Sequence, residues 1–140
     1  MSITKAATGA PAAKQRTGSR LVPIFLAVIS TTVVWYIAHS VLDVDLKAKT
    51  GATVTEVTLP TVIVVTFVVG MLAWALLALL ERLTGAVRGI WTTIAVLFFL
   101  VSLLGPAGAV GNSAKLGLAC LHIVTALVII PGLGRTARRR

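Results

Sequence analysis

The chain has 140 residues, of which 57% are hydrophobic and only 12% are charged, with a formal net charge of +9 at pH 7. An average soluble domain is less apolar and carries about twice this share of charged residues, so the composition excludes an ordinary soluble fold. The single cysteine, Cys120, excludes an intramolecular disulfide and the CxxC pair that four-helix thiol oxidoreductases need.

Four apolar stretches cover most of the chain, at about 21–42, 61–80, 86–104 and 116–133. Each has about the 17–25 residues that an α-helix needs to cross a hydrocarbon core roughly 30 Å thick. Nothing of domain size remains outside them. We therefore expect an all-α integral membrane protein, with one four-helix transmembrane bundle over residues 21–134.

The basic residues gather on one side of these stretches. Four precede the first stretch, two flank the link between the second and third, and four close the chain, whereas only three lie in the other two links. This asymmetry of 10 to 3 follows the positive-inside rule, so we expect both termini in the cytoplasm and loops 43–60 and 105–115 outside. The same placement indicates that the basic residues orient the chain in the membrane and attract anionic lipid. It argues against a nucleic-acid partner.

The N-terminal segment has two interpretations. Residues 1–20 are small and polar without an apolar period, which predicts a disordered basic tail, and 135–140 form a second basic tail. The basic start and the small-x-small triplet that ends at Ser40 are typical of a cleaved signal peptide. The apolar run is longer than the roughly 7–15 residues of a signal peptide, and Trp35 with Tyr36 is typical of a membrane interface. We predict retention as the first helix, with cleavage as the alternative.

One stripe of this first helix is polar and aromatic. Thr32, Trp35, Tyr36, His39 and Asp43 share it at 100° per residue. Asp43 follows His39 by four residues, which would bring its carboxylate within reach of the ring. In the loop that follows, Thr and Val alternate over 53–59, which suits either a short extended segment or an early start of the second helix.

The second helix has a face of small residues, which allows close packing in lipid. That face comprises Thr66, Gly70, Ala73 and Leu77. Glu81 is the only acidic residue near this helix and follows it at the cytoplasmic end, beside Arg82. We expect an interfacial partner there, and not the deep carboxylate of small multidrug exporters.

The fourth stretch carries His122 on a small, polar stripe with Thr125, while Cys120 points away from that stripe. An imidazole that faces lipid would leave its N–H unpaired, at a cost of several kcal/mol. We predict that His122 faces the interior, packs toward the polar stripe of the first helix and has a hydrogen-bond partner within about 3.2 Å. A structural role that links two helices and a role in binding a ligand, proton or metal both stay open.

Cofactor chemistry finds little support in the sequence. Haem between His39 and His122 demands matched depth, and their positions differ by about 4 Å at 1.5 Å per residue. The closely spaced ligand pair of a zinc site is missing, as are a nucleophile–base pair, a carboxylate dyad and a phosphate-binding glycine loop. We expect no cofactor, no metal site and no enzymatic activity.

The segments IAHSVLDVDL, AWALLALLERLTGAVRGIWTTIAVLFFLVSLLGP and LACLHIVTALVIIPGLGR, in this order, resemble an actinobacterial family of small four-helix integral membrane proteins classed as a domain of unknown function. The resemblance covers residues 21–134 and implies four helices in the plasma membrane. It implies no activity.

Two functional hypotheses follow. The first is a non-enzymatic structural, accessory or regulatory bundle in the bacterial plasma membrane, with membrane lipids and other membrane proteins or a second copy as partners. The alternative is a small-molecule binding or transport module with an outward-facing pocket. The candidate pocket residues are Thr32, Trp35, Tyr36, His39, Asp43, Ser102, His122 and Thr125.

Overall fold

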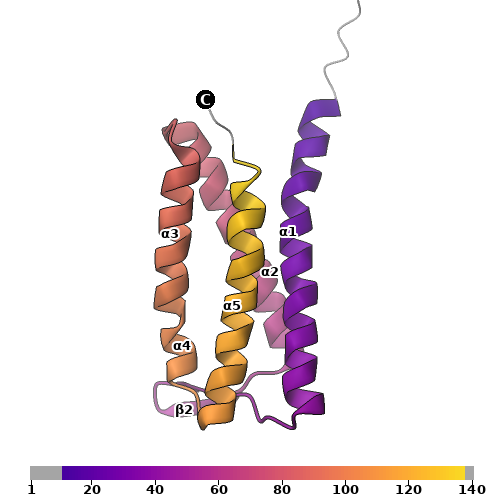
Figure 1. The fold of residues 1–140 in the computed structure, drawn as a ribbon, viewed down its shortest axis with the longest axis vertical. Coiled ribbons are helices and arrows are strands. Elements are labelled where there is room, and N and C mark those ends of the chain that lie inside the picture. Colours follow the sequence, from indigo (N-terminus) through magenta and orange to yellow (C-terminus); the bar gives the residue numbers. More distant parts are fainter. Residues whose placement is uncertain (1–10, 138–140) are drawn as a thin grey trace, which may run out of the picture.

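The computed structural model describes residues 11–137, with side chains from residue 18 onward except that of Thr50. Within this range, four long helices stand side by side as an antiparallel bundle (Figure 1). They are α1 (Pro11–Tyr36), α2 (Leu59–Leu83), α3 (Val87–Ser102) and α5 (Asn112–Gly134). A single helical turn, α4 (Leu104–Ala107), prolongs α3.

The described chain contains four segments that are long and apolar enough to cross a membrane. They are Gly18–Val41, Leu59–Leu83, Val87–Ala107 and Asn112–Gly134, which confirms the four predicted stretches to within a few residues. α1 begins at Pro11 and so overlaps the segment 1–20 that we expected as a tail. Residues 1–10 of that tail, and 138–140 of the second, lie outside the described residues.

α1 and α3 occupy opposite corners of the bundle, because each packs against both α2 and α5. Helices alternate in direction, so the start of α1, the short link between α2 and α3 and the end of α5 meet at one end (Figure 1). This end carries Arg20, Arg82, Arg88 and Arg135, and we call it the basic end. We call the opposite end, which carries a two-stranded hairpin, the hairpin end.

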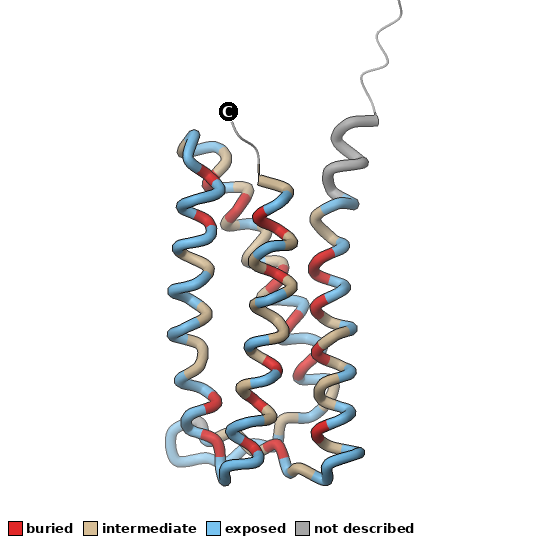
Figure 2. The backbone as a smooth tube through the Cα atoms, viewed as in Figure 1, coloured by how far each residue is buried: buried red, intermediate tan, exposed pale blue. Residues whose placement is uncertain are grey.

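The core of the basic end is built from side chains of all four long helices, on the sides that face one another (Figure 2). Trp91 of α3 is 1% exposed, and its indole N–H donates to the Ile130 carbonyl of α5 at 3.2 Å. The helices meet closely at glycines: a Cβ built on Gly132 would lie 2.5 Å from the Pro23 Cβ. The members of this core are Ile24, Ala27, Leu77, Leu80, Val87, Trp91, Ile129 and Leu133.

The core of the hairpin end depends on a residue from outside the helices. Leu46, in the link after α1, is 1% exposed and packs against α5 where Gly117 leaves room for it. A Cβ built on Gly117 would lie 2.6 Å from the Leu46 Cδ2. The members of this core are Ala38, Leu46, Val62, Ala109, Ala114, Leu118 and Leu121.

The predicted small face of α2 points into the bundle, as expected. Thr66, Gly70 and Leu77 are buried, and Ala73 packs on the basic-end core. A Cβ built on Gly70 would lie 2.8 Å from Cγ2 of Ile24 in α1, so glycine is needed for this approach. Nearby, the buried hydroxyls of Thr31 and Thr66 lie 3.4 Å apart and join α1 to α2.

A β-hairpin adds to the predicted all-α fold. Its strands are β1 (Lys47–Thr50) and β2 (Thr53–Glu56), paired antiparallel with Lys47 opposite Glu56. Gly51 has φ +63° at the first turn position, where the type II′ turn requires a positive φ. The extended interpretation of the Thr–Val alternation is confirmed, and α2 begins only at Leu59, with Pro60 in its first turn.

α1 ends in a single π-helical stretch, η1 (Ile37–Val41), closed by the bond from the Leu42 N–H to the Ile37 carbonyl. The next residue, Asp43, has φ 52°, a left-handed conformation that aspartate tolerates better than most residues. Asp43 therefore leaves the helix. The α-helical spacing that would have put its carboxylate one turn below His39 does not hold, because the backbone changes conformation between them.

Candidate functional site

Trp35 and His39 form the most definite contact among the predicted pocket residues. Their rings stack with centroids 4.6 Å apart and an interplanar angle of 28°. The indole N–H of Trp35 donates to the Val57 carbonyl at 2.8 Å, just before α2 begins. This bond ties the end of α1 to the residue after the hairpin, so the ring is held by His39 on one face and by the Val57 carbonyl at its edge. The arrangement fixes a stacked pair at the hairpin end.

Asp45, two residues after Asp43, forms an ion pair with Lys47 at this end. Asp45 accepts a hydrogen bond from the Lys47 Nζ at 2.9 Å. This bond and the charge of Lys47 hold the pKa of Asp45 below its ordinary value of 3.8, and the charge of His39 makes a smaller contribution in the same direction. The bond to Asp45 in turn raises the pKa of Lys47.

Asp43 lines a shallow groove of about 310 Å³ at the hairpin end. The groove runs between the link after α1 and the start of α5, where Asp45, Asn112 and Ser113 add polar groups. Of the eight predicted pocket residues, only Asp43 lines this groove. Its walls come from two links and the start of α5, which no sequence pattern predicted to lie together.

Two of the remaining predicted residues, Ser102 and Thr125, have hydrogen-bond partners within their own helices. Ser102 donates to the Phe99 carbonyl at 2.7 Å, and Thr125 donates to the Leu121 carbonyl at 2.8 Å. Tyr36 is 59% exposed, and Thr32 is half-buried.

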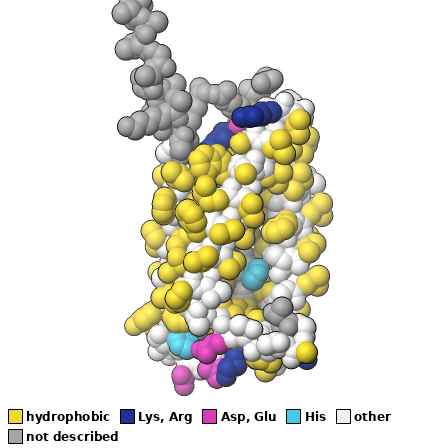
Figure 3. All heavy atoms as spheres, turned by 180° about the vertical axis from the view of Figure 1, so that it is seen from behind, with side chains coloured by type: hydrophobic (Ala, Val, Ile, Leu, Met, Phe, Trp, Pro, Cys, Tyr) yellow, Lys and Arg dark blue, Asp and Glu magenta, His cyan; other side chains and the backbone are white. Residues whose placement is uncertain are grey.

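His122 is half-buried, and its Nδ1 lies 2.9 Å from the Leu118 carbonyl. The predicted partner within about 3.2 Å is confirmed. It lies four residues back on the same helix, so this bond gives Nδ1 a partner within α5 and does not link α5 to another helix. Figure 3 shows one histidine side chain among acidic groups and another apart from them, within the apolar surface. Cys120 is exposed, as its position on the opposite side of α5 predicts.

An ion pair at the basic end was missed by the sequence reasoning. A nitrogen of the Arg20 guanidinium lies 2.6 Å from Oε1 of Glu81, and the two side chains are only 13% and 14% exposed. Arg20 also approaches the Thr136 carbonyl at 3.4 Å, so it joins α1, α2 and the residues after α5. The sequence predicts an interfacial role for Glu81 beside Arg82 without naming its partner, and in the structure Arg20 is one partner. The sequence feature that could have indicated this pair is that Glu81 is the only acidic residue beside several cations.

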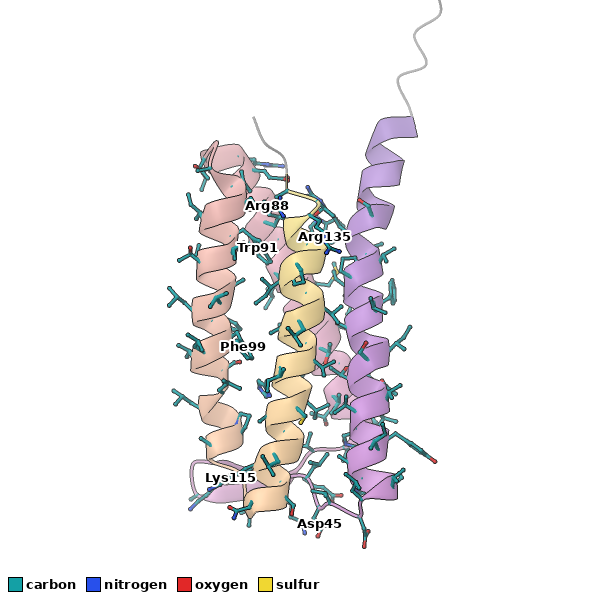
Figure 4. The ribbon with its side chains drawn as sticks, in the orientation of Figure 1. Asp45, Arg88, Trp91, Phe99, Lys115 and Arg135 are labelled. Atoms are coloured by element: carbon teal, nitrogen blue, oxygen red, sulfur yellow. The ribbon has the colours of Figure 1, made fainter. Side chains whose placement is uncertain are left out.

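A second groove, of about 370 Å³, lies at the basic end between α1 and α5. Val22, Pro23 and Leu26 form its α1 wall, and Leu127 and Pro131 form its α5 wall. Arg135 lines the same groove just after α5, and Figure 4 shows it on the side of α5 that faces α1. No sequence pattern predicted this groove, because its walls come from helices at opposite ends of the chain.

Large apolar side chains are exposed on every long helix of the bundle, and Figure 3 shows them over the middle of the molecule, with charged groups toward the two ends. α3 contributes Leu97, Phe98, Leu100 and Val101, all more than half exposed. Figure 4 shows Trp91 and Phe99 on the other side of α3, toward α5. Within residues 11–137, no three His, Cys, Asp or Glu side chains are placed to hold a metal ion.

The fold and these surfaces define a small, mainly helical protein whose described chain has four helices suited to crossing a membrane. The chain belongs to the family of unknown function DUF6069, whose model matches residues 11–139. The expected membership in a family without known function is thereby confirmed. Neither the curated proteins nor the solved structures include a match to the chain.

Proposed function

We propose that the protein is a non-enzymatic, multi-pass protein of the bacterial plasma membrane. In this proposal it acts as a structural, accessory or regulatory bundle through lateral contacts with lipid and with another membrane protein or a second copy of itself. Both termini lie in the cytoplasm, because ten of the 13 basic residues of the sequence precede the first span, flank the link between α2 and α3 or follow the last span, and cytoplasmic loops are enriched in Lys and Arg.

The observation that carries this proposal is the exposure of α3. In its candidate span, 11% of the residues are buried, against 22–28% in the other three. Only Val87 and Trp91 are buried along α3, both near the basic end. The rest of the helix presents aliphatic and aromatic side chains outward, among them Phe98 at 64% exposure. A helix that uses so little of its surface within its own bundle has most of it available to a neighbour.

The alternative, a small-molecule module with an outward-facing pocket, has less support. Ser102, His122 and Thr125 each direct a polar atom to a carbonyl of their own helix, which leaves less hydrogen-bonding capacity for a ligand. Trp35 and His39 are engaged with each other. The groove at the hairpin end shares only Asp43 with the predicted pocket.

A photo-crosslinking experiment tests the lateral contact. A photoreactive phenylalanine analogue replaces Phe98 on α3 or, as the control, Phe25 on α1, which is 53% exposed and leans on Phe67 of α2. Illumination of cells should give a discrete protein adduct from position 98 and none, or far less, from position 25. An adduct at twice the chain's mass identifies a second copy. Equal absence of protein adducts at both positions contradicts the lateral contact.

A further inference from the structure

The groove between α1 and α5 at the basic end owes its shape to one close contact. The Pro23 ring packs on Gly132, where any side chain would collide with it. On the outward side of this contact, Val22 and Leu26 of α1 are 62% and 51% exposed, and Leu127 of α5 is 67% exposed. These side chains form two apolar walls along an open trough of about 370 Å³. We call it the α1–α5 groove.

The mouth of the α1–α5 groove is cationic. Arg135 lines it and is exposed, and none of the acidic groups in residues 11–137 forms an ion pair with it. The neighbouring Arg20 has its charge engaged by Glu81, so among the described residues that line this groove Arg135 is the one cation. Ser19 adds a second polar residue to the same lining.

The combination of an open apolar trough and a cation at one end matches the shape and charge of a phospholipid. An acyl chain lies along the trough, and a phosphate accepts hydrogen bonds from a guanidinium, which suits that geometry better than an ammonium does. A water-soluble anion would use Arg135 but gain nothing from the walls. The uncompensated charge of Arg135 favours a headgroup with net negative charge over a zwitterion.

We propose that the α1–α5 groove binds one anionic phospholipid of the cytoplasmic leaflet, with its phosphate at Arg135 and one acyl chain between Val22 and Leu127. This rests on the proposed function, since it requires the basic end to face the cytoplasm. The bound lipid covers the seam between the first and last helices, which are the two farthest apart in sequence. It therefore acts as a specific partner at that seam, distinct from the general lipid around the bundle.

Lipid binding is measured by native mass spectrometry of the purified full chain, released from detergent after titration with phosphatidylglycerol or with phosphatidylcholine of the same acyl chains. The wild type should bind one phosphatidylglycerol with a clear preference. Arg135→Gln should reduce that preference about fivefold, as expected for the loss of one basic residue near an anionic headgroup. Arg82→Gln is the matched control, because Arg82 is exposed at the same end but does not line the groove, and it should leave the preference unchanged.

A steric variant tests the trough separately from the charge. Val22→Trp places a large ring in the groove without entering a core, and we expect at least a tenfold loss of bound phosphatidylglycerol. Val33→Trp, at a position on α1 that is 51% exposed and outside the groove, should bind as the wild type does.

Three results would overturn the proposal. They are equal binding of the two lipids by the wild type, equal effects of Arg135→Gln and Arg82→Gln, and full displacement of phosphatidylglycerol by millimolar inorganic phosphate, which would indicate a site for free anions. These failures are separable from failure of the proposed function. The cross-linking from position 98 would persist if only the lipid site were wrong.

Discussion

At the basic end, the helices close the bundle with their own side chains, whereas at the hairpin end a link between elements does so. Trp91 is buried against α5, and Arg20 reaches Glu81 across the helix ends. At the hairpin end, Leu46 comes from the link after α1 and fills the space beside Gly117. The Val110 N–H then bonds the Lys47 carbonyl at 3.1 Å, which fastens the hairpin to the segment before α5. The basic end thus depends on packing between helices, and the hairpin end depends on the position of the links that connect them.

The first helix contributes to both ends, so loss of α1 would affect both. α1 supplies Ile24 and Ala27 to the core of the basic end, and Ala38 of η1 belongs to the core of the hairpin end. We predict that the first helix is retained, and mass spectrometry of membrane-extracted protein should find peptides that join the residues on both sides of Ser40. A mature N-terminus at Val41 would contradict retention of the first helix. Both cores would then lose the residues that α1 and η1 supply.

Breaking the ion pair should weaken the basic end most among single substitutions. Glu81→Gln leaves the Arg20 guanidinium nearly buried without its countercharge, which we expect to lower the free energy of unfolding by about 3 kcal/mol. Reversible unfolding in mixed detergent–SDS micelles measures this. Glu56→Gln, at an exposed strand position, is the control and should change little.

The double variant Arg20→Met with Glu81→Met sharpens the result. Removal of both charges from a buried pair is often neutral, so this variant should recover most of the stability lost in Glu81→Gln. A double variant as unstable as the single one would show that the ion pair is not the cause.

Leu46→Ala should weaken the hairpin end by about 2 kcal/mol, the lower part of the range for buried leucines, because a link can partly collapse into the cavity. Its effect should be local: amide exchange at Val57 and Val110 should accelerate, while exchange along α3 near Trp91 stays slow. Leu42→Ala, at a position 64% exposed in the same region, is the control. If amide exchange accelerated equally at both ends, the two ends would not be stabilised independently of each other.

The smallest effect concerns the exposed Asp45–Lys47 pair beside the hairpin. Since the pKa of Asp45 is lowered in the fold, its ionised form stabilises the hairpin end at pH values above 3.8, and this contribution is lost as the pH falls through the lowered value. Thermal unfolding between pH 7 and pH 3 should therefore show a slightly larger decrease for the wild type than for Asp45→Asn. Identical pH dependence of the two would contradict the assigned hydrogen bond.

The sequence predicted the helices well and the closure of the hairpin end poorly, for identifiable physical reasons. Membrane-length apolar runs and the small face of α2 are local patterns, and both reappear in the fold. The position of Leu46 depends on its meeting Gly117, 71 positions later in the chain, and no local pattern carries that information. β1 was missed because its sequence, KAKT, has none of the alternation that marked β2.

The candidate site shows the same division. Trp35 and His39 are four residues apart on one helix, and their stacking follows the predicted stripe. Asp43 departs from that stripe because η1 and a left-handed residue change the helical spacing that the prediction assumed. Glu81 pairs with Arg20, 61 residues away, a contact that a local sequence pattern does not indicate.

Both proposals require a bundle that crosses the membrane with its basic end in the cytoplasm. In a Cys120→Ala variant, single cysteines at Thr50, Thr84 or Ser113 are exposed to a membrane-impermeant thiol reagent in intact cells. We predict labelling at positions 50 and 113, at the hairpin end, and labelling at position 84 only after the cells are opened. Labelling of position 84 in intact cells, or no labelling of position 50, would contradict this orientation.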